Sequence, residues 1–384
     1  MTINKYILLL LTASLFWLSS CIDEYWPEVS KYENLLVVDG GITNEVPPYT
    51  VKLSISSPIN DIDNQPFTSC NLIFEDGDGN QEYLYEIEPG VYKTPVDGMQ
   101  GEIGKKYKLR IQTPDGKIYE SSFEYLKKPV LIDKIDAKTE TKSSDNVDHD
   151  LQGYQFYVNT EAPSSDTNYY LWKLNYTYHY QSDYFIKWYF TGQLNRFLPI
   201  DSLYNCYTTR SVNKIYTYNT ENITNKRLED FPLNFVSTET RQLSLRYSLL
   251  VKQHTISKQA YIFWSALEKQ NSDQGSLYSR QPFQIRGNIR NVNDAEEPVL
   301  GYFLLSGIDS SRIFVDRPNL PFYYSECSIN EGNYLQYTEI GATDPVLYPV
   351  YVIVYAGNRA VPGQACADCR QRGGAIVKPE FWED

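Results

Sequence analysis

The stretch YYLWKLNYTYHY, residues 169–180, determines the fold class of this chain. Large and mostly aromatic side chains occupy every second position, and polar side chains separate most of them. Because successive side chains of a strand point to opposite faces, this spacing predicts a long β-strand with one aromatic face. That face carries Tyr170, Trp172, Leu174, Tyr176 and Tyr178. Residues 184–190 follow closely enough to be its hairpin partner.

Tyrosine is unusually abundant in the whole chain, with 34 residues against two methionines. Tyrosine suits the half-buried face of a pleated sheet. It also suits binding faces, because its rigid ring ends in one polar group. We therefore expect a mainly β, extracellular protein, with a carbohydrate- or peptide-binding surface as the alternative explanation of the tyrosines.

The first part of the chain predicts a β-sandwich over residues 33–130. Residues 49–55, YTVKLSI, alternate between apolar and polar side chains, as expected of a half-buried strand. Turn sequences rich in Gly and Asp occur at 39–41, before this stretch, and at 75–80 and 114–116, after it. Short strands spaced by about 8–12 residues indicate an immunoglobulin-like or transthyretin-like sandwich.

The acidic turn EDGDGN, residues 75–80, has two interpretations. Its composition resembles a calcium-binding loop, but it lacks the full spacing and the closing glutamate of an EF-hand. We favour a plain hairpin turn.

A second and larger β-rich domain is predicted over residues 150–384, after a polar stretch at 140–150. Its one clear helix begins at Ser257, a good N-cap residue, and ends near residues 273–275. Apolar side chains recur there at helical spacing and predict a buried face. They are Ala260, Phe263, Trp264 and Leu267.

The chain begins with a predicted lipoprotein signal peptide, residues 1–20. Lys5 is the only charged side chain before Cys21, and an apolar run follows it that is too short to span a membrane comfortably. We expect Cys21 to carry diacylglycerol and acyl chains and to become the first residue of the mature protein. Residues 21–32 then form a lipidated tether.

The charge of the chain excludes some partners. The formal net charge is −13, so nucleic acid and polybasic attraction to anionic lipid are both disfavoured. The acyl chains on Cys21 supply the contact with the lipid bilayer instead.

Five further cysteines are expected to be mostly oxidised in an exported protein. Cys70 is isolated in a strand-like sequence and is predicted to be a buried free thiol. Cys366 and Cys369 are too close to prefer each other, so each is expected to pair with Cys206 or Cys327; the order stays open. A zinc or redox function of the Cys366–Cys369 pair lacks the second ligand pair or the βαβ context that it needs.

No catalytic motif is evident in the sequence. The three histidines, His149, His179 and His254, have no metal-ligand spacing, and neither a nucleophile elbow nor a phosphate-binding loop occurs. We therefore predict a protein that is not an enzyme and has no metal or other cofactor, with a surface hydrolase as a minority alternative.

Several motifs resemble a known family. They are residues 36–44 (LVVDGGITN), 88–92 (EPGVY), 104–107 with 114–116, 247–253 (YSLLVKQ), 287–289, 298–303 (PVLGYF), 312–314, and the ending at 366–370, 373–374 and 378–382. Together they are similar to a family of Bacteroidota outer-membrane lipoproteins, the domain-of-unknown-function family numbered 4249. This chain departs from the pattern at Asn291, close to the position where the family leads us to expect another cysteine.

The resemblance implies a lipid-anchored protein of the outer membrane that is exposed on the cell surface. It also implies a partner, an outer-membrane β-barrel of the TonB-dependent-receptor type, and no established catalytic residues. Asp23 and Glu24, just behind Cys21, look like the acidic signals that direct such lipoproteins to the outer face.

Three hypotheses for the function follow. The first is a non-enzymatic accessory subunit of the barrel that helps to capture a nutrient such as a peptide or glycan. The second is a structural subunit of an outer-membrane protein assembly or secretion complex. The third is a hydrolase.

Overall fold

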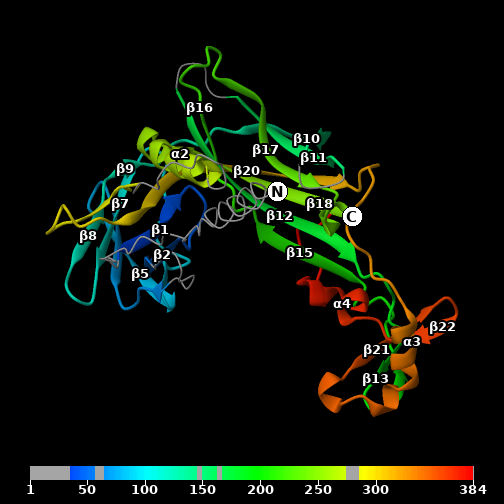
Figure 1. Cartoon of the computed structure of the whole chain (residues 1–384). Coiled ribbons are helices and arrows are strands. Elements are labelled where there is room, and N and C mark those ends of the chain that lie inside the picture. Colours follow the sequence, from blue (N-terminus) through cyan, green and yellow to red (C-terminus); the bar gives the residue numbers. More distant parts are fainter. Residues whose placement is uncertain (1–34, 57–64, 145–148, 162–166, 274–284, 384) are drawn as a thin grey trace, which may run out of the picture.

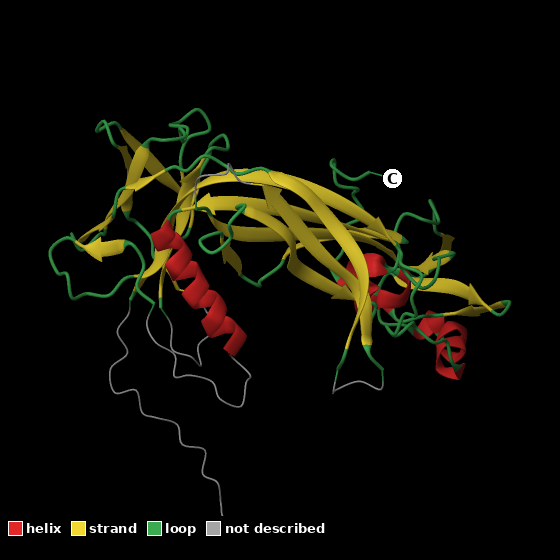
Figure 2. Cartoon of the chain, turned by 90° about the horizontal axis from the view of Figure 1, so that it is seen from above, coloured by secondary structure: helices red, strands yellow, loops and turns green. Residues whose placement is uncertain are grey.

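The computed structural model describes residues 35–56, 65–144, 149–161, 167–273 and 285–383. Strands dominate this part of the chain, which confirms the mainly β class. The molecule is elongated: a sandwich of strands lies at one end, long curved strands form the middle, and a small lobe lies at the other end (Figures 1 and 2). The predicted signal peptide, Cys21 and the tether all precede the described residues.

The sandwich contains the strands that the alternating sequence predicts. Tyr49, Val51 and Leu53 all point into its core, as the pattern of residues 49–55 indicates. Its first strands are β1 (Leu36–Thr43), β2 (Thr50–Ile55), β3 (Gln65–Pro66), β4 (Asn71–Asp76), β5 (Gln81–Glu88), β6 (Val91–Lys93), β7 (Lys106–Gln112), β8 (Ile118–Ser121) and β9 (Glu124–Tyr125).

The acidic turn between β4 and β5 is a hairpin turn, as we favoured. Oδ1 of Asp76 accepts hydrogen bonds from the backbone N–H groups of Asp78 and Asn80, each at 2.9 Å. Oδ2 accepts a third, from the side-chain amide of Asn80 at 2.8 Å. The carboxylate therefore stabilises its own turn.

One long strand joins the sandwich to the middle of the molecule. β20 (Leu300–Asp316) runs parallel to β1 over residues 300–306. Over residues 307–316 it pairs antiparallel with β18 (Arg246–Ile256). A single continuous strand thus belongs to both parts, and the hydrogen-bonded sheet does not stop between them.

Residues from late in the chain complete the sandwich. β19 (Ile289–Asn291) pairs antiparallel with β8 at the end of the sheet. Ile289, Val299, Phe303 and Leu305 lie in the same core as β2 and β4. The core of the sandwich therefore extends beyond the sequence range 33–130.

The middle of the molecule is built around β12 (Tyr169–Gln181). It pairs with β18 on one side and with β15 (Asn205–Ser211) and β16 (Tyr216–Asn219) on the other. A second sheet contributes to the same core, formed by β10 (Ile132–Lys142), β11 (Leu151–Glu161) and β17 (Arg227–Ser237). The predicted aromatic face of β12 is confirmed: its alternate side chains from Tyr170 to Tyr178 all contribute to this core.

The prediction that residues 184–190 form the hairpin partner of β12 is wrong. Within residues 184–190, only Trp188–Phe190 form a strand, β13, which belongs to a separate sheet with β14 (Leu194–Arg196), β21 (Val350–Tyr355) and β22 (Asn358–Ala360). The backbone N–H groups of Asp183 and Tyr184 donate to the carbonyl of Cys366, at 2.9 and 3.0 Å. The chain therefore leaves the sheet at this point to meet a segment that is distant in sequence.

The predicted helix is α2 (Lys258–Asp273), and Ser257 caps it by accepting a hydrogen bond from the N–H of Ala260. Ala260 and Phe263 are buried, and Trp264 and Leu267 pack against the same cluster, so the predicted apolar face is confirmed. Among the described residues, no helix has both the length and the apolar character that crossing a bilayer requires.

Residues 183–203 and 326–368 form the small lobe, which we call the distal lobe (Figure 1). It contains the sheet of β13, β14, β21 and β22 around a small core of its own. The remaining helical segments of the described chain are α3 (Glu331–Thr338), α4 (Gln364–Ala367), η1 (Arg241–Leu243), η2 (Ile340–Ala342), η3 (Pro345–Leu347) and η4 (Cys369–Arg372).

Candidate functional site

Two disulfides fasten the C-terminal segment to the rest of the molecule. Cys206 of β15 is bonded to Cys369, and Cys327 is bonded to Cys366. Each cysteine of the closely spaced pair therefore reaches back to an earlier cysteine, as the sequence predicts. The remaining described cysteine, Cys70, is buried and free, also as predicted.

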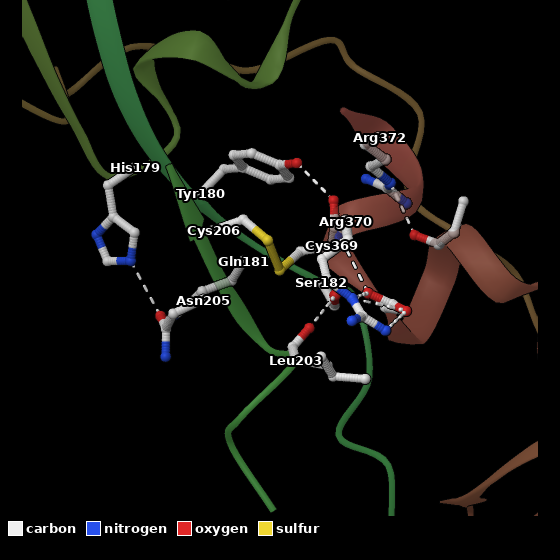
Figure 3. Close-up of a disulfide and its surroundings, with 12 residues drawn as sticks. His179, Tyr180, Gln181, Ser182, Leu203, Asn205, Cys206, Cys369, Arg370 and Arg372 are labelled. Carbon is white, nitrogen blue, oxygen red and sulfur yellow. Dashed lines mark hydrogen bonds and ion pairs between the residues drawn. A yellow bond between two sulfur atoms is a disulfide. The ribbon is translucent and has the colours of Figure 1, made fainter. Parts of the chain in front are cut away.

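Figure 3 shows how the Cys206–Cys369 disulfide is embedded. The hydroxyl of Tyr180, the last buried ring of β12, donates to the carbonyl oxygen of Cys369 at 2.6 Å. The backbone N–H of Cys369 donates to the carbonyl oxygen of Leu203 at 3.1 Å. The disulfide is thus part of a buried contact between the tail and the edge of the middle sheet.

Asp183, Cys327 and Cys366 place three potential metal-ligand atoms close together. Both sulfur atoms belong to the disulfide, so neither can act as a thiolate ligand. The Asp183 carboxylate forms ion pairs with Arg241 and Arg372, each at 2.7 Å. The cluster therefore joins the distal lobe to the middle of the molecule and does not have the donor set of a metal site.

The three histidines all take part in packing. The rings of His149 and His179 stack on Tyr323 and Tyr207. Burial lowers the pKa of His254 well below its usual value. The polar partners of His149, His179 and His254 are Glu239, Asn205 and Ser306, at 2.7, 3.0 and 2.8 Å. The three rings thus have separate partners and do not form one shared site.

A cleft of about 660 Å³ lies between α2 and the segment that leads into β19. Its wall is largely apolar, and Arg286, Arg290 and Gln259 add polar groups to the lining. The main apolar lining residues are Ile262, Phe263, Ala266, Ile285, Ile289 and Tyr302. This volume falls within the range of small-molecule and cofactor pockets, which is about 300–1,000 Å³.

A buried carboxylate lies next to the cleft. Glu124 accepts hydrogen bonds from the hydroxyls of Tyr302 and Ser257 and from the side-chain amide of Asn288. Burial raises the pKa of Glu124, and these three hydrogen bonds partly offset that effect. Because Ser257 caps α2 and Asn288 precedes β19, the carboxylate connects the two elements that border the cleft.

No sequence motif pointed to this cleft. Its residues come from segments around positions 122, 259–266 and 285–302, and only the fold brings them together. The apolar spacing of α2 did predict a buried face, but it gave no sign that Ile262, at 56 % exposure, lies beside a hollow.

Asn291, where the family pattern leads us to expect a cysteine nearby, has a structural role of its own. It is buried, and its side-chain oxygen accepts a hydrogen bond from the N–H of Asn293 at 2.8 Å. Its side-chain amide donates to Glu297. The asparagine therefore stabilises the turn that follows β19.

The distal lobe exposes many large apolar side chains. The most exposed are Val346 at 86 % and Leu198 at 71 %. The others are Phe185, Ile200, Leu335, Leu347, Val354 and Tyr355. Single exposed apolar residues are ordinary, and the sandwich also exposes several, among them Val46, Tyr85 and Val96. Those of the distal lobe are therefore a candidate contact surface only if they act together.

Comparison with known proteins gives one result for the family. No curated protein matches the sequence significantly. The profile of one family, described as "Domain of unknown function (DUF4249)", matches residues 22–312. This range covers the sandwich and most of the middle of the molecule, whereas the cysteine-bearing ending lies outside it. Because the match spans well over half of the chain, the protein belongs to the DUF4249 family.

Proposed function

We propose that this protein is a non-enzymatic lipoprotein of the outer membrane, anchored through acyl chains on Cys21 and exposed on the cell surface. It acts as an accessory subunit of a TonB-dependent-receptor-like barrel and takes part in nutrient capture. The observation that carries the proposal is the cysteine directly after a short apolar signal sequence, in a chain with a β-rich, acidic body.

The distal lobe supports a role in binding another protein. Its exposed apolar side chains would lose contact with water in an interface, which is the main favourable contribution to association. The Asp183–Arg241 ion pair joins the lobe to the middle of the molecule, and the Cys206–Cys369 disulfide fastens the chain that directly follows the lobe. The Cys327–Cys366 disulfide lies within the lobe. A surface held in this way loses little conformational freedom on binding.

One variant tests the membrane anchor at Cys21, and a second tests the contact between the distal lobe and the barrel. Cys21→Ala should move the protein from the membrane fraction to the soluble fraction. The wild-type protein, purified from native membranes in mild detergent, should bring a barrel of this type with it. Val346→Glu with Leu347→Glu should abolish that co-purification, because two charges would enter the apolar contact.

A matched control uses the sandwich. Val96 is 75 % exposed there, so Val96→Glu adds charge to an equally accessible apolar position. We expect this variant to retain the barrel. A wild-type protein that purifies alone would contradict the proposed function. If the Val346→Glu, Leu347→Glu variant retains the barrel as Val96→Glu does, the distal lobe is not the contact surface.

A further inference from the structure

The cleft between α2 and the segment entering β19 has an apolar wall with surface left uncovered. Ile262 of α2 is exposed, and Ala266 and Ile285 are half-buried, so each keeps surface that a bound molecule could cover. Phe263 and Ile289 are buried and contribute the base of the cleft. The volume of about 660 Å³ is sufficient for a small organic molecule. Because three of these side chains are aliphatic and accessible, an aliphatic ligand would remove apolar surface from water here.

Two arginines line the same cleft without a partner for their charge. Arg286 and Arg290 are exposed, and neither side chain makes a hydrogen bond or an ion pair with another described residue. The whole chain carries a net charge of −13, so two unpaired guanidinium groups beside one apolar cleft are unexpected. Positive charge next to an apolar wall complements a molecule that joins an acidic group to an apolar body.

Two carboxylates in this region already have other partners. Glu120 lies opposite Arg290 in the ladder of β8 and β19. It forms ion pairs with Lys108 and Arg110, at 3.6 and 3.7 Å. Glu124 is buried, does not line the cleft and accepts three hydrogen bonds. The two arginines at the cleft are therefore available to an acidic ligand.

We propose that this cleft binds a small amphipathic carboxylic acid with an aliphatic body. The aliphatic body packs against Ile262, Ala266 and Ile285, and the carboxylate binds the guanidinium groups of Arg286 and Arg290. The inference goes beyond the proposed function and does not depend on it, because neither the anchor nor the distal lobe contributes to the cleft.

Octanoate and octan-1-ol are the two probes, because they share an aliphatic chain and differ in charge. The protein used spans residues 22–384, so it carries no acyl chain and needs no detergent that would compete for the cleft. In saturation-transfer NMR titrations it should bind octanoate roughly five- to tenfold more tightly than octan-1-ol. This difference should shrink as salt is raised from about 50 to about 500 mM, because ions screen exposed charges.

The arginines are tested by the double variant Arg286→Gln, Arg290→Gln. It should bind octanoate roughly fivefold more weakly and keep its affinity for octan-1-ol, because the substitutions remove the positive charge. Arg196→Gln is the matched control, since Arg196 is also exposed but lies in the distal lobe. This control should bind both probes as the wild type does.

The apolar wall is tested by Ile262→Glu, which should weaken the binding of both probes and affect octanoate more. Val96→Glu is the matched control, because Val96 is exposed in the sandwich and does not line the cleft. All the substituted side chains are exposed, so an unchanged melting temperature shows that each variant is folded.

Three results would overturn the inference. They are no saturable binding of octanoate, equal affinity of the wild type for the two probes, and unchanged octanoate affinity in either the arginine variant or Ile262→Glu. Failure of the barrel co-purification would leave this inference standing, so the two proposals fail separately.

Discussion

The phenol hydroxyl of Tyr302 donates a hydrogen bond to Oε1 of Glu124, although the two residues are 178 positions apart in the sequence. Glu124 is the first residue of β9 in the sandwich, and Tyr302 lies near the start of β20, the strand that continues into the middle of the molecule. This contact, together with those of Ser257 and Asn288, places a buried carboxylate where the sandwich, α2 and β20 meet.

Glu124 should make the stability depend on pH in a defined direction. Its pKa is raised in the folded state, mainly by burial, so the folded chain holds this proton more tightly than the unfolded chain. The stability that it contributes is fully present below pH about 4.3 and declines as the pH rises through the raised pKa. Glu124→Gln has no such titration.

The difference in unfolding free energy between Glu124→Gln and wild type should therefore shift in favour of the variant from pH 4 to pH 8. Urea denaturation at each pH measures the two unfolding free energies, and their subtraction cancels the titration of the groups that both proteins share. A difference that stays constant, or shifts the other way, would contradict the assignment.

Tyr302→Phe should destabilise the protein by about 1.5–3 kcal/mol at neutral pH, because the hydrogen bond that is lost has a charged acceptor. The loss should be smaller at pH 4, where more of Glu124 is protonated. Tyr83→Phe is the matched control, because Tyr83 is 55 % exposed and should change stability little. Equal losses of unfolding free energy at both pH values would show that the charge of Glu124 does not strengthen this hydrogen bond.

Gly307→Ala should destabilise the protein by about 1–3 kcal/mol, as expected when an atom is forced into a packed site. A Cβ on Gly307 would lie 2.3 Å from the carbonyl oxygen of Lys127, where the chain leaving the sandwich crosses β20. Gly341→Ala is the control, because a Cβ there would meet no atom within 4 Å. Thermal denaturation measures both; similar melting temperatures for the two variants would contradict this close crossing.

The two disulfides should differ in their contribution to stability. Cys206 and Cys369 are separated by 163 positions, and Cys327 and Cys366 by 39. In the chain-entropy description, replacing the first pair by serine should cost about 1 kcal/mol more than replacing the second. Denaturant unfolding of both double variants measures this. A larger loss for the shorter loop would show that strain or local packing dominates.

Cys70 should be unreactive in the folded protein. Burial is the main reason that its pKa is raised to about 11, and little thiolate is present at neutral pH. Iodoacetamide at pH 8 should modify Cys70 only after urea is added, as mass spectrometry of the intact protein will show. Rapid modification without urea would mean that the start of β4 opens readily.

Local pattern was sufficient to predict several elements. The alternation of residues 49–55 and of β12 reports which side chains face a core, because a strand has a period of two. The helical spacing from Ala260 to Leu267 predicted the buried face of α2 in the same way. The oxidised and free cysteines were also predictable, because the spacing of Cys366 and Cys369 favours pairing with earlier cysteines and Cys70 is isolated in the sequence.

The partner of each strand was not predictable in this way. Residues 184–190 follow β12 directly, but contacts with Cys366 direct them into the distal lobe. Likewise, the sandwich takes Ile289 and Phe303 from beyond the middle of the molecule. Period and propensity specify which face is apolar, but they do not specify which distant apolar face will cover it.

Local sequence patterns were enough to predict the β class, the aromatic face of β12, helix α2 and the family, and they also predict an export signal that ends at Cys21. The tertiary structure alone decided that β20 belongs to both the sandwich and the middle of the molecule, that Glu124 is buried against Tyr302, and that a cleft lies between β19 and α2. The pairing of β20 with β1, the pairing of β19 with β8 and the Glu124–Tyr302 hydrogen bond each join residues more than 100 positions apart. Packing of the whole chain selects such long-range contacts, and they leave no local sequence pattern.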